Sequence, residues 1–238
     1  MDTFRGFDRD TFFLLAENKF NDSKPYYETV KDQLKQKAIL PMRELCSLLA
    51  DELFAIDEQM NLIPVKMVSR IRRDTRRAKD QNMYRDNIWT MFMRHKSAWH
   101  YQPCMWFEIF PGGYTIGVGT YDTDPTFMAY FRRVLVENQT EFRAALQSVQ
   151  SVGALPDAEH YAKEKPGSDK VAADLRPYYN VKSLYFIRYD SEMETLFNGS
   201  IYPILQKTIA AYAPMYHFLL KVMETVTAEK GKQYEQIL

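Results

Sequence analysis

Cysteine and glycine are both scarce in this sequence. Only Cys46 and Cys104 occur among 238 residues, too few for a disulfide framework or a paired-cysteine zinc site. Two isolated thiols are typical of a reducing compartment, so we expect a cytoplasmic protein. The nine glycines form no Walker loop and no dinucleotide-binding motif. Their scarcity also argues against a loop-rich, all-β fold.

Long apolar runs and an excess charge are absent as well. No apolar stretch approaches the roughly 20 residues that span a bilayer, and charged residues interrupt the N-terminus where a signal peptide has an apolar core. We therefore expect a soluble protein that does not associate with membranes. The 31 basic residues balance 31 acidic ones, which argues against nucleic acid as a partner. Any attraction for a charged ligand must then be local.

The length and the apolar content are those of a globular protein. With 238 residues, of which 46% are hydrophobic, the chain can bury a large core, and we expect residues 1–238 to form a single domain. Aromatic residues, at 14%, supply much of that core.

Apolar residues repeat with helical spacing at the start of the chain. A first helix is expected after Asp8 or Asp10, either of which can cap it, and a second after Ser23, which precedes Pro25. A third runs from Pro41 with one apolar stripe. The stripe consists of Met42, Leu45, Leu49 and Leu53.

The middle of the chain alternates apolar and polar residues, as strands do. We expect strands over residues 63–73, 88–93 (buried on both faces), 104–110 and 114–121, the last two joined as a hairpin by Pro111-Gly112-Gly113. Gly117 and Gly119 leave a bare patch that a backbone, an aromatic ring or a ligand can approach.

Helical patterns return after residue 125 and continue to about residue 150. Residues 152–177 are irregular, and residues 184–189 indicate another strand. Ser191 and Glu194 have capping-box spacing, Gly199 can end that helix, and Pro214 should break or kink the last one. The pattern predicts an α+β fold, with an antiparallel sheet and its central hairpin packed against N-terminal and C-terminal helices.

Residues 70–80 contain the highest local charge density in the chain, with six basic residues in eleven positions. Guanidinium groups offer a planar fork of donors that fits phosphate and carboxylate oxygens, so a convergent set would bind an anion. The alternative is an internal network in which these side chains pair with nearby carboxylates. The candidate ligand-binding residues are Arg70, Arg72, Arg73, Arg76, Lys79 and Arg85.

The same segment carries a family resemblance. Arg73-Asp74-Thr75-Arg76, Lys79-Asp80 and Tyr84-Arg85 resemble the signature Arg-Asp-x-Arg-Phe-x-Lys-Asp-x-x-Pro-Tyr-Lys of the domain of unknown function 2461 family. Arg77, Met83 and Arg85 differ from that signature. Asn18, Tyr27 and Val30, the hairpin glycines and the Lys165-Pro166 turn follow the expected order. The resemblance implies relatives but no biochemical activity.

Other catalytic candidates are weaker. Asp74, Asp80 and His160 can transfer protons, but no two of the four histidines have metal-ligand spacing on a helix, so we expect no metal and no cofactor. Three functions stay open: binding of a small anionic or phosphorylated ligand, an enzyme acting on a phosphorylated or acidic substrate, and a purely structural salt-bridge network. The oligomeric state cannot be predicted from these patterns.

Overall fold

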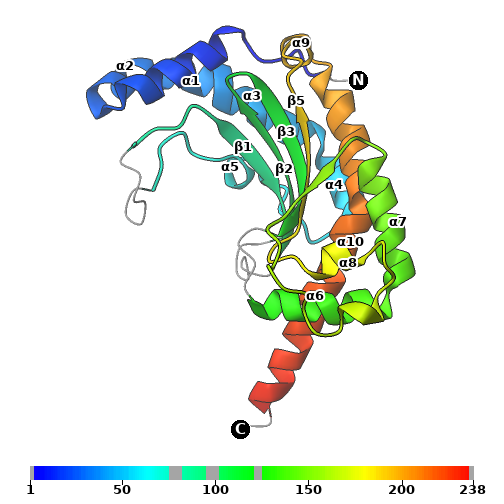
Figure 1. The fold of residues 1–238 in the computed structure, drawn as a ribbon. Helices are drawn as coiled ribbons and strands as arrows, with labels where there is room; N and C mark the ends of the chain where they lie inside the picture. The colour runs from blue at the N-terminus through cyan, green and yellow to red at the C-terminus, as the bar shows by residue number, and fades with distance from the viewer. Residues whose placement is uncertain (1–2, 75–81, 95–101, 121–124, 236–238) are drawn as a thin grey trace. The chain divides into compact units, whose positions relative to one another are not determined.

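The fold is α+β, as the sequence predicts, with helices flanking a five-stranded antiparallel sheet (Figure 1). The computed structural model describes residues 3–74, 82–94, 102–120 and 125–235. The main helices are α1 (Asp10–Asn21), α2 (Lys24–Leu34), α3 (Leu40–Leu48), α4 (Ala50–Ile56), α6 (Pro125–Glu137), α7 (Gln139–Gln150) and α10 (Ile201–Glu235). The short helices are α5 (Pro64–Met67), α8 (Arg176–Tyr179) and α9 (Glu194–Phe197), with a 3-10 turn, η3 (Ser168–Lys170).

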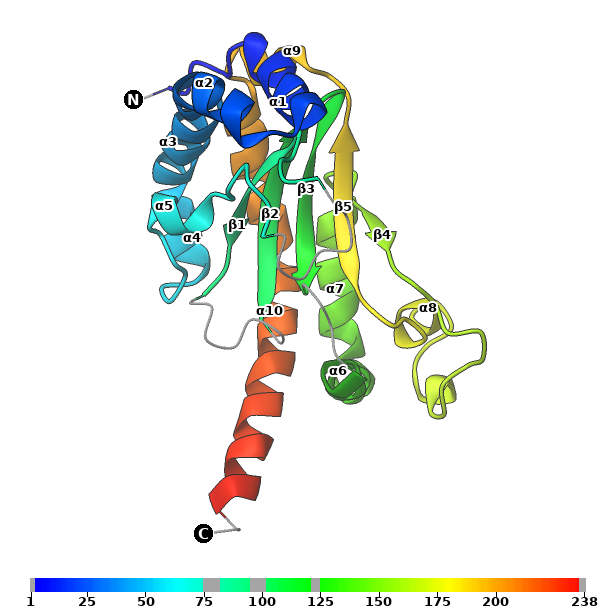
Figure 2. The same ribbon diagram turned by 90° about the vertical axis from the view of Figure 1, so that its left-hand side faces the viewer.

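The strands lie in the order β1-β2-β3-β5-β4 (Figure 2). They are β1 (Ile88–Phe92), β2 (Pro103–Phe110), β3 (Gly113–Thr120), β4 (Leu155–Asp157) and β5 (Tyr185–Asp190). The predicted hairpin is thus confirmed as β2 and β3, and the predicted strand at residues 184–189 as β5. Along β1, buried residues alternate with half-buried ones, so the expectation that both of its faces are buried is wrong.

The chain forms two compact units that share strands of the sheet. The first comprises residues 1–92, 106–116 and 189–207, and the second comprises residues 93–105, 117–188 and 208–238. The expected single domain stays a prediction.

In the first unit, the predicted second and third helices are joined into one rod. A π-helical turn, η1 (Lys35–Ile39), links α2 directly to α3, and Ser23 caps the start of α2 as expected. Pro41 has no N–H with which to bond the carbonyl of Lys37 in an α-helix. That carbonyl instead accepts a hydrogen bond of 2.8 Å from the hydroxyl of Thr11, which is fully buried on α1. This hydrogen bond gives the carbonyl group of Lys37 a donor within the wider π-helical turn.

The predicted strand over residues 63–73 is wrong. Residues 64–67 form α5 because Pro64 suits the first turn of a helix, and the carbonyl of Ile63 accepts bonds from the N–H groups of Lys66 and Met67. Only isolated bridges follow, which join Val68 to Thr90 and Arg72 to Tyr84. The basic residues therefore follow a short helix rather than a sheet strand.

In the second unit, α10 runs past Pro214, so this proline does not break the helix, whereas the expected kink stays a prediction. Both Pro214 and Ala210, whose carbonyl loses its helical donor, are exposed, so that carbonyl remains accessible to water. Buried residues on the other side hold the helix together. They are Tyr212, Met215, Tyr216 and Phe218, and Phe218 packs against Phe131 and Phe142.

Two smaller expectations have clear outcomes. At Gly119 both a backbone and an aromatic ring approach the bare patch, since a Cβ there would lie 2.6 Å from the carbonyl oxygen of Leu184 and 2.8 Å from Cδ1 of Tyr185. The capping box does not form, because α9 starts after Met193 without a side-chain cap, whereas Gly199 follows its end with φ +81°. Among the described residues, no helix is both long enough and apolar enough to cross a lipid bilayer.

Candidate anion-binding site

The predicted basic segment is part of a two-stranded arm in the first unit. We call residues 68–74 and 82–87 the basic arm. Its halves pair through the bridge between Arg72 and Tyr84 and through two backbone hydrogen bonds. Arg73 N donates to Met83 O at 2.8 Å, and Arg85 N donates to Ile71 O at 3.0 Å. This pairing brings Arg70, Arg72, Arg73 and Arg85 onto one small element, although they are up to 15 residues apart.

The end of α1 holds the basic arm in place. Asp22 has a left-handed backbone (φ 39°) just after the helix, and its Oδ1 accepts the N–H groups of Met83 at 2.7 Å and Tyr84 at 3.0 Å. Lys19 adds an ion pair of 2.9 Å with Asp86. Because the carboxylate of Asp22 accepts two backbone N–H groups of the arm, it fixes the arm against the helix.

The predicted arginines have different environments. Arg70 and Arg72 are exposed, and no ion pair joins either side chain to the part of the chain that the structure describes. Arg85 lies over the ring of Trp89, with 4.5 Å from its Cζ to the ring centroid, and donates to the carbonyl of Arg70 at 3.1 Å. Arg73 is half-buried and has interactions of its own. The predicted Arg76, Lys79 and Asp80 lie outside the described residues.

A pair of tyrosines connects the basic arm to α2. Tyr84 is fully buried and stacks on Tyr27, with ring centroids 4.9 Å apart and planes 21° apart. Burial raises the pKa of Tyr84, and the positive charge of Arg72 acts in the opposite direction. The backbone bridge between Arg72 and Tyr84 places Arg72 beside the stacked pair.

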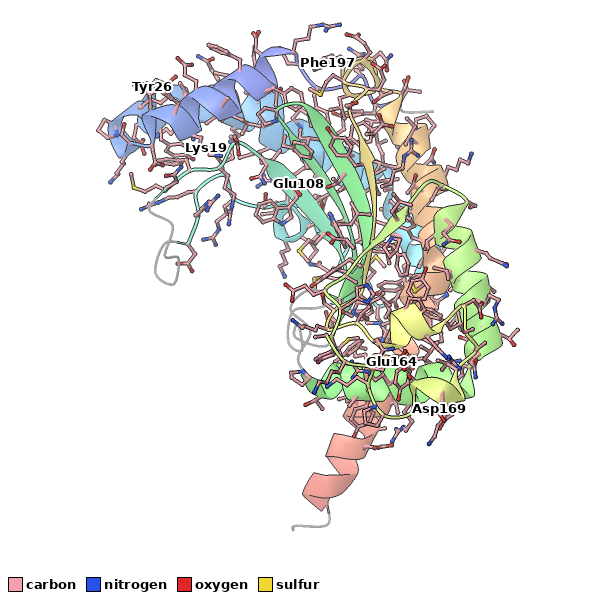
Figure 3. The ribbon with its side chains drawn as sticks, viewed as in Figure 1. Lys19, Tyr26, Glu108, Glu164, Asp169 and Phe197 are labelled. Carbon is pink, nitrogen blue, oxygen red and sulfur yellow. The ribbon has the colours of Figure 1, made fainter. Side chains whose placement is uncertain are left out.

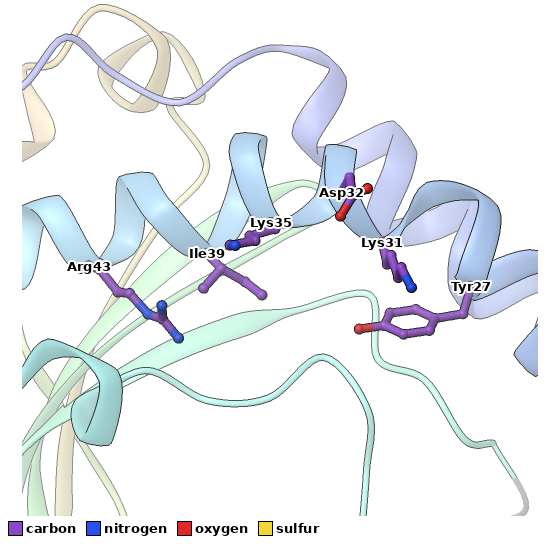
Figure 4. Close-up of a pocket in the computed structure, with 6 residues that line it drawn as sticks. All are labelled: Tyr27, Lys31, Asp32, Lys35, Ile39 and Arg43. Carbon is purple, nitrogen blue, oxygen red and sulfur yellow. The ribbon is translucent and has the colours of Figure 1, made fainter.

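Beside this pair, the first unit has a shallow pocket that the sequence analysis did not predict. Its volume is about 200 Å³, and all of its lining residues project from the rod of α2, η1 and α3 (Figure 4). They are Tyr27, Lys31, Asp32, Lys35, Ile39 and Arg43. Three cationic side chains and one carboxylate thus surround a space that begins at the tyrosine pair.

A regular spacing in the sequence indicates this pocket in retrospect. Tyr27, Lys31, Lys35, Ile39 and Arg43 are each four residues apart. In a straight α-helix, each four-residue step turns about 40° beyond a full turn, so such a stripe would drift around the helix. The π-helical turn over 35–39 takes more residues per turn and opposes this drift. The stripe therefore lies along one pocket instead of winding away from it.

The pocket's charges are only partly neutralised. Lys31 pairs with Glu28 at 2.6 Å, but both side chains are about half exposed, so the pair is weak. Lys35 is exposed. The Nε of Arg43 is buried and has no hydrogen-bond partner in the described part of the chain. No ion pair joins Arg43 to the described residues, so its charge stays available to the pocket that it lines.

A second feature of the first unit is the half-buried carboxylate of Glu108 on β2 (Figure 3). Nδ2 of Asn87 donates a short hydrogen bond to it. Burial raises the pKa of Glu108, while this hydrogen bond and the charge of Arg85 oppose the rise. The sequence analysis missed this residue, although it is the only charged residue in the strand 103–110.

The remaining catalytic candidates do not join these groups. Asp74 is an exposed residue of the basic arm, with interactions of its own. His160 belongs to the second unit, where it is exposed and its backbone bridges to Val181. Across the described ranges, no three His, Cys, Asp or Glu side chains come together to hold a metal ion.

Comparison with protein families finds a match over most of the chain. A family model described as Conserved hypothetical protein (DUF2461) matches residues 10–218. The chain belongs to this family. The DUF2461 match includes the pocket, the basic arm and Glu108, and it confirms the resemblance found in the signature residues. No curated protein matches the chain.

Proposed function

We propose that this DUF2461 protein binds a small anionic or phosphorylated ligand between the rod of α2, η1 and α3 and the basic arm. The observation that carries the proposal is the grouping of Lys31, Lys35 and Arg43 in one pocket. The stacked pair of Tyr27 and Tyr84 extends from that pocket to Arg72. Cations from two separate elements thus border one aromatic pair.

The chemistry of these groups suits phosphate and carboxylate oxygens. Arginine donates in a planar fork, and lysine supplies a point charge that adapts to the ligand. Because the pocket is shallow and its charges are exposed, water and salt screen them. We therefore expect a dissociation constant in the range of about 1 μM to 1 mM, falling as the ionic strength is lowered.

Thermal unfolding at low salt tests the proposal. Phosphate, sugar phosphates and nucleotides should raise the unfolding temperature of the parent protein, since a ligand that binds only the folded state stabilises it. Lys35→Gln and Arg72→Gln should reduce that rise. Lys24→Gln, which removes the same charge from α2 outside the pocket, should not. If no anion stabilises the parent protein, the proposal is wrong.

A second candidate function is an enzyme acting on a phosphorylated or acidic substrate. The half-buried Glu108 favours it, since a carboxyl group with a raised pKa is a candidate general acid or base. Glu108→Gln should then abolish turnover of phosphoesters while the stabilisation by anions persists. Turnover that is unchanged in this variant would exclude Glu108 from the chemistry.

The third alternative treats the arginines as purely structural. The stacking of Arg85 on Trp89 and its bond to the Arg70 carbonyl support that role for Arg85 itself. Under this alternative, double-mutant cycles within the basic arm would show coupling in stability, and anions would have no effect. We also propose a cytoplasmic location, supported by the buried residues Cys46 and Cys104, which are not joined in a disulfide bond.

A further inference from the structure

The pocket has a cation at each end, and a third cation and an apolar side chain in its middle. Tyr27 and Lys31 lie at one end of the pocket and Arg43 at the other, with Lys35 and Ile39 beside each other in the middle (Figure 4). Lys31 and Arg43 are twelve residues apart, which corresponds to roughly 18 Å along a helix axis at 1.5 Å per residue. Even with side chains that bend inward, the two ends remain separate binding points.

A single small anion cannot contact the cations at both ends of the pocket. Inorganic phosphate can contact one end, where its charge gains little from cations at the other end in a high-dielectric, salt-screened groove. It also leaves the side chain of Ile39 uncovered. A longer molecule can contact both ends at once, and a carbon chain between its charged groups can cover Ile39.

We infer that the pocket selects an elongated ligand with two anionic groups joined by an apolar spacer. This inference rests on the proposed function and names its ligand class. The guanidinium of Arg43 binds the second anionic group. Lys31 and Lys35, with the hydroxyl of Tyr27, bind the first. Once the first group is bound, the second binds at a high effective concentration, so the affinity gain requires both ends of the pocket.

Calorimetric titration of the full-length protein at low salt tests the inference with a graded series of ligands. The series is inorganic phosphate, pyrophosphate, propane-1,3-diyl bisphosphate and hexane-1,6-diyl bisphosphate. We expect the hexanediyl compound to bind at least about tenfold more tightly than phosphate, because linked groups gain from effective concentration. Pyrophosphate, whose charges are adjacent, should gain much less.

Variants at the far end separate this inference from general charge effects. Arg43→Gln should reduce the preference for the long bisphosphate to about twofold or less and leave phosphate binding nearly unchanged. Arg43→Lys, which retains the charge, should keep most of the preference, and Lys24→Gln should keep all of it. Unfolding curves of each variant, compared with the parent protein, establish that the fold is intact.

The outcomes distinguish the two proposals. If phosphate binds and the hexanediyl compound binds no more tightly, the inference is overturned while the proposed function stands. The inference also fails if the long bisphosphate is preferred equally by the parent protein and by a folded Arg43→Gln variant. If no member of the series binds, both proposals fall.

Discussion

Glu108 shows how one residue can link stability to pH. It is a half-buried carboxyl group beside Asn87, Arg85 and Asp86, and burial is the largest cause of its raised pKa. In the interval between its ordinary value of 4.5 and its folded value, the folded protein therefore binds more protons than the unfolded chain. The contribution of Glu108 to stability is thus greatest at low pH and decreases as the pH rises through that interval.

We predict that Glu108→Gln stabilises the protein at neutral pH and removes this part of the pH dependence. Glutamine keeps an oxygen for the N–H of Asn87 but has no charge to bury. Urea unfolding between pH 4 and pH 8 measures the effect, with Glu58→Gln as a control at an exposed site. If the free energy of unfolding changes with pH equally in the parent protein and in Glu108→Gln, Glu108 is not the source of this pH dependence.

At the scale of elements, the basic arm depends on α1 for its position. Its two halves are joined by one isolated bridge and two backbone hydrogen bonds rather than by a regular ladder, so their own pairing is limited. Asp22 supplies two further acceptor bonds from a position that also ends the helix. The exposed Arg72 owes its place beside the tyrosine pair to this anchor.

We predict that Asp22→Ala destabilises the protein by about 1–3 kcal/mol, since it leaves two backbone donors without their acceptor. Asp22→Asn should cost less, because asparagine keeps an Oδ1 acceptor and tolerates a left-handed backbone. Chemical denaturation gives the stabilities, and amide hydrogen exchange at Met83 and Tyr84 reports the two bonds directly. Equal decreases in stability for Asp22→Ala and Asp22→Asn would mean that the acceptor oxygen of residue 22 does not stabilise the protein.

At the scale of the whole molecule, the two ends of the first unit's sequence interlock through glycines. Gly6 has φ +101°, and a Cβ there would overlap the carbonyl oxygen of Phe197. Gly199 has φ +81°, and a Cβ there would overlap the carbonyl oxygen of Phe4. Phe7 N also donates to Leu196 O at 2.7 Å. The N-terminal segment therefore packs against the end of α9 without room for side chains.

We predict that Gly6→Ala destabilises the protein far more than Gly112→Ala does. Both glycines have φ +101°, so each substitution costs the same backbone strain of about 1–2 kcal/mol. Only Gly6 adds a clash with backbone, because nothing lies within 4 Å of a Cβ built at Gly112. Thermal unfolding of the two variants isolates the clash. Similar decreases in unfolding temperature for both variants would show that the N-terminal segment can move away from Phe197.

Much of the local structure could be predicted from the sequence. The hairpin of β2 and β3, the Ser23 cap and the glycine that follows α9 are all specified by neighbouring residues. The strand over residues 63–73 was predicted wrongly, because alternating apolar residues there resemble a strand while Pro64 starts a helix. The cation stripe from Lys31 to Arg43 was missed, because its four-residue spacing makes a single face only across a π-helical turn.

The sequence by itself determined the fold class, the family and the concentration of charge between residues 70 and 80, since these depend on composition, periodicity and signature residues. Only the tertiary structure decided which cations meet. The Asp22 anchor, the stack of Tyr84 on Tyr27 and the bridge from Tyr84 to Arg72 place Arg72 near the tyrosine end of the pocket. Burial likewise sets the pKa of Glu108. Such effects depend on distance in space, which a single sequence does not record.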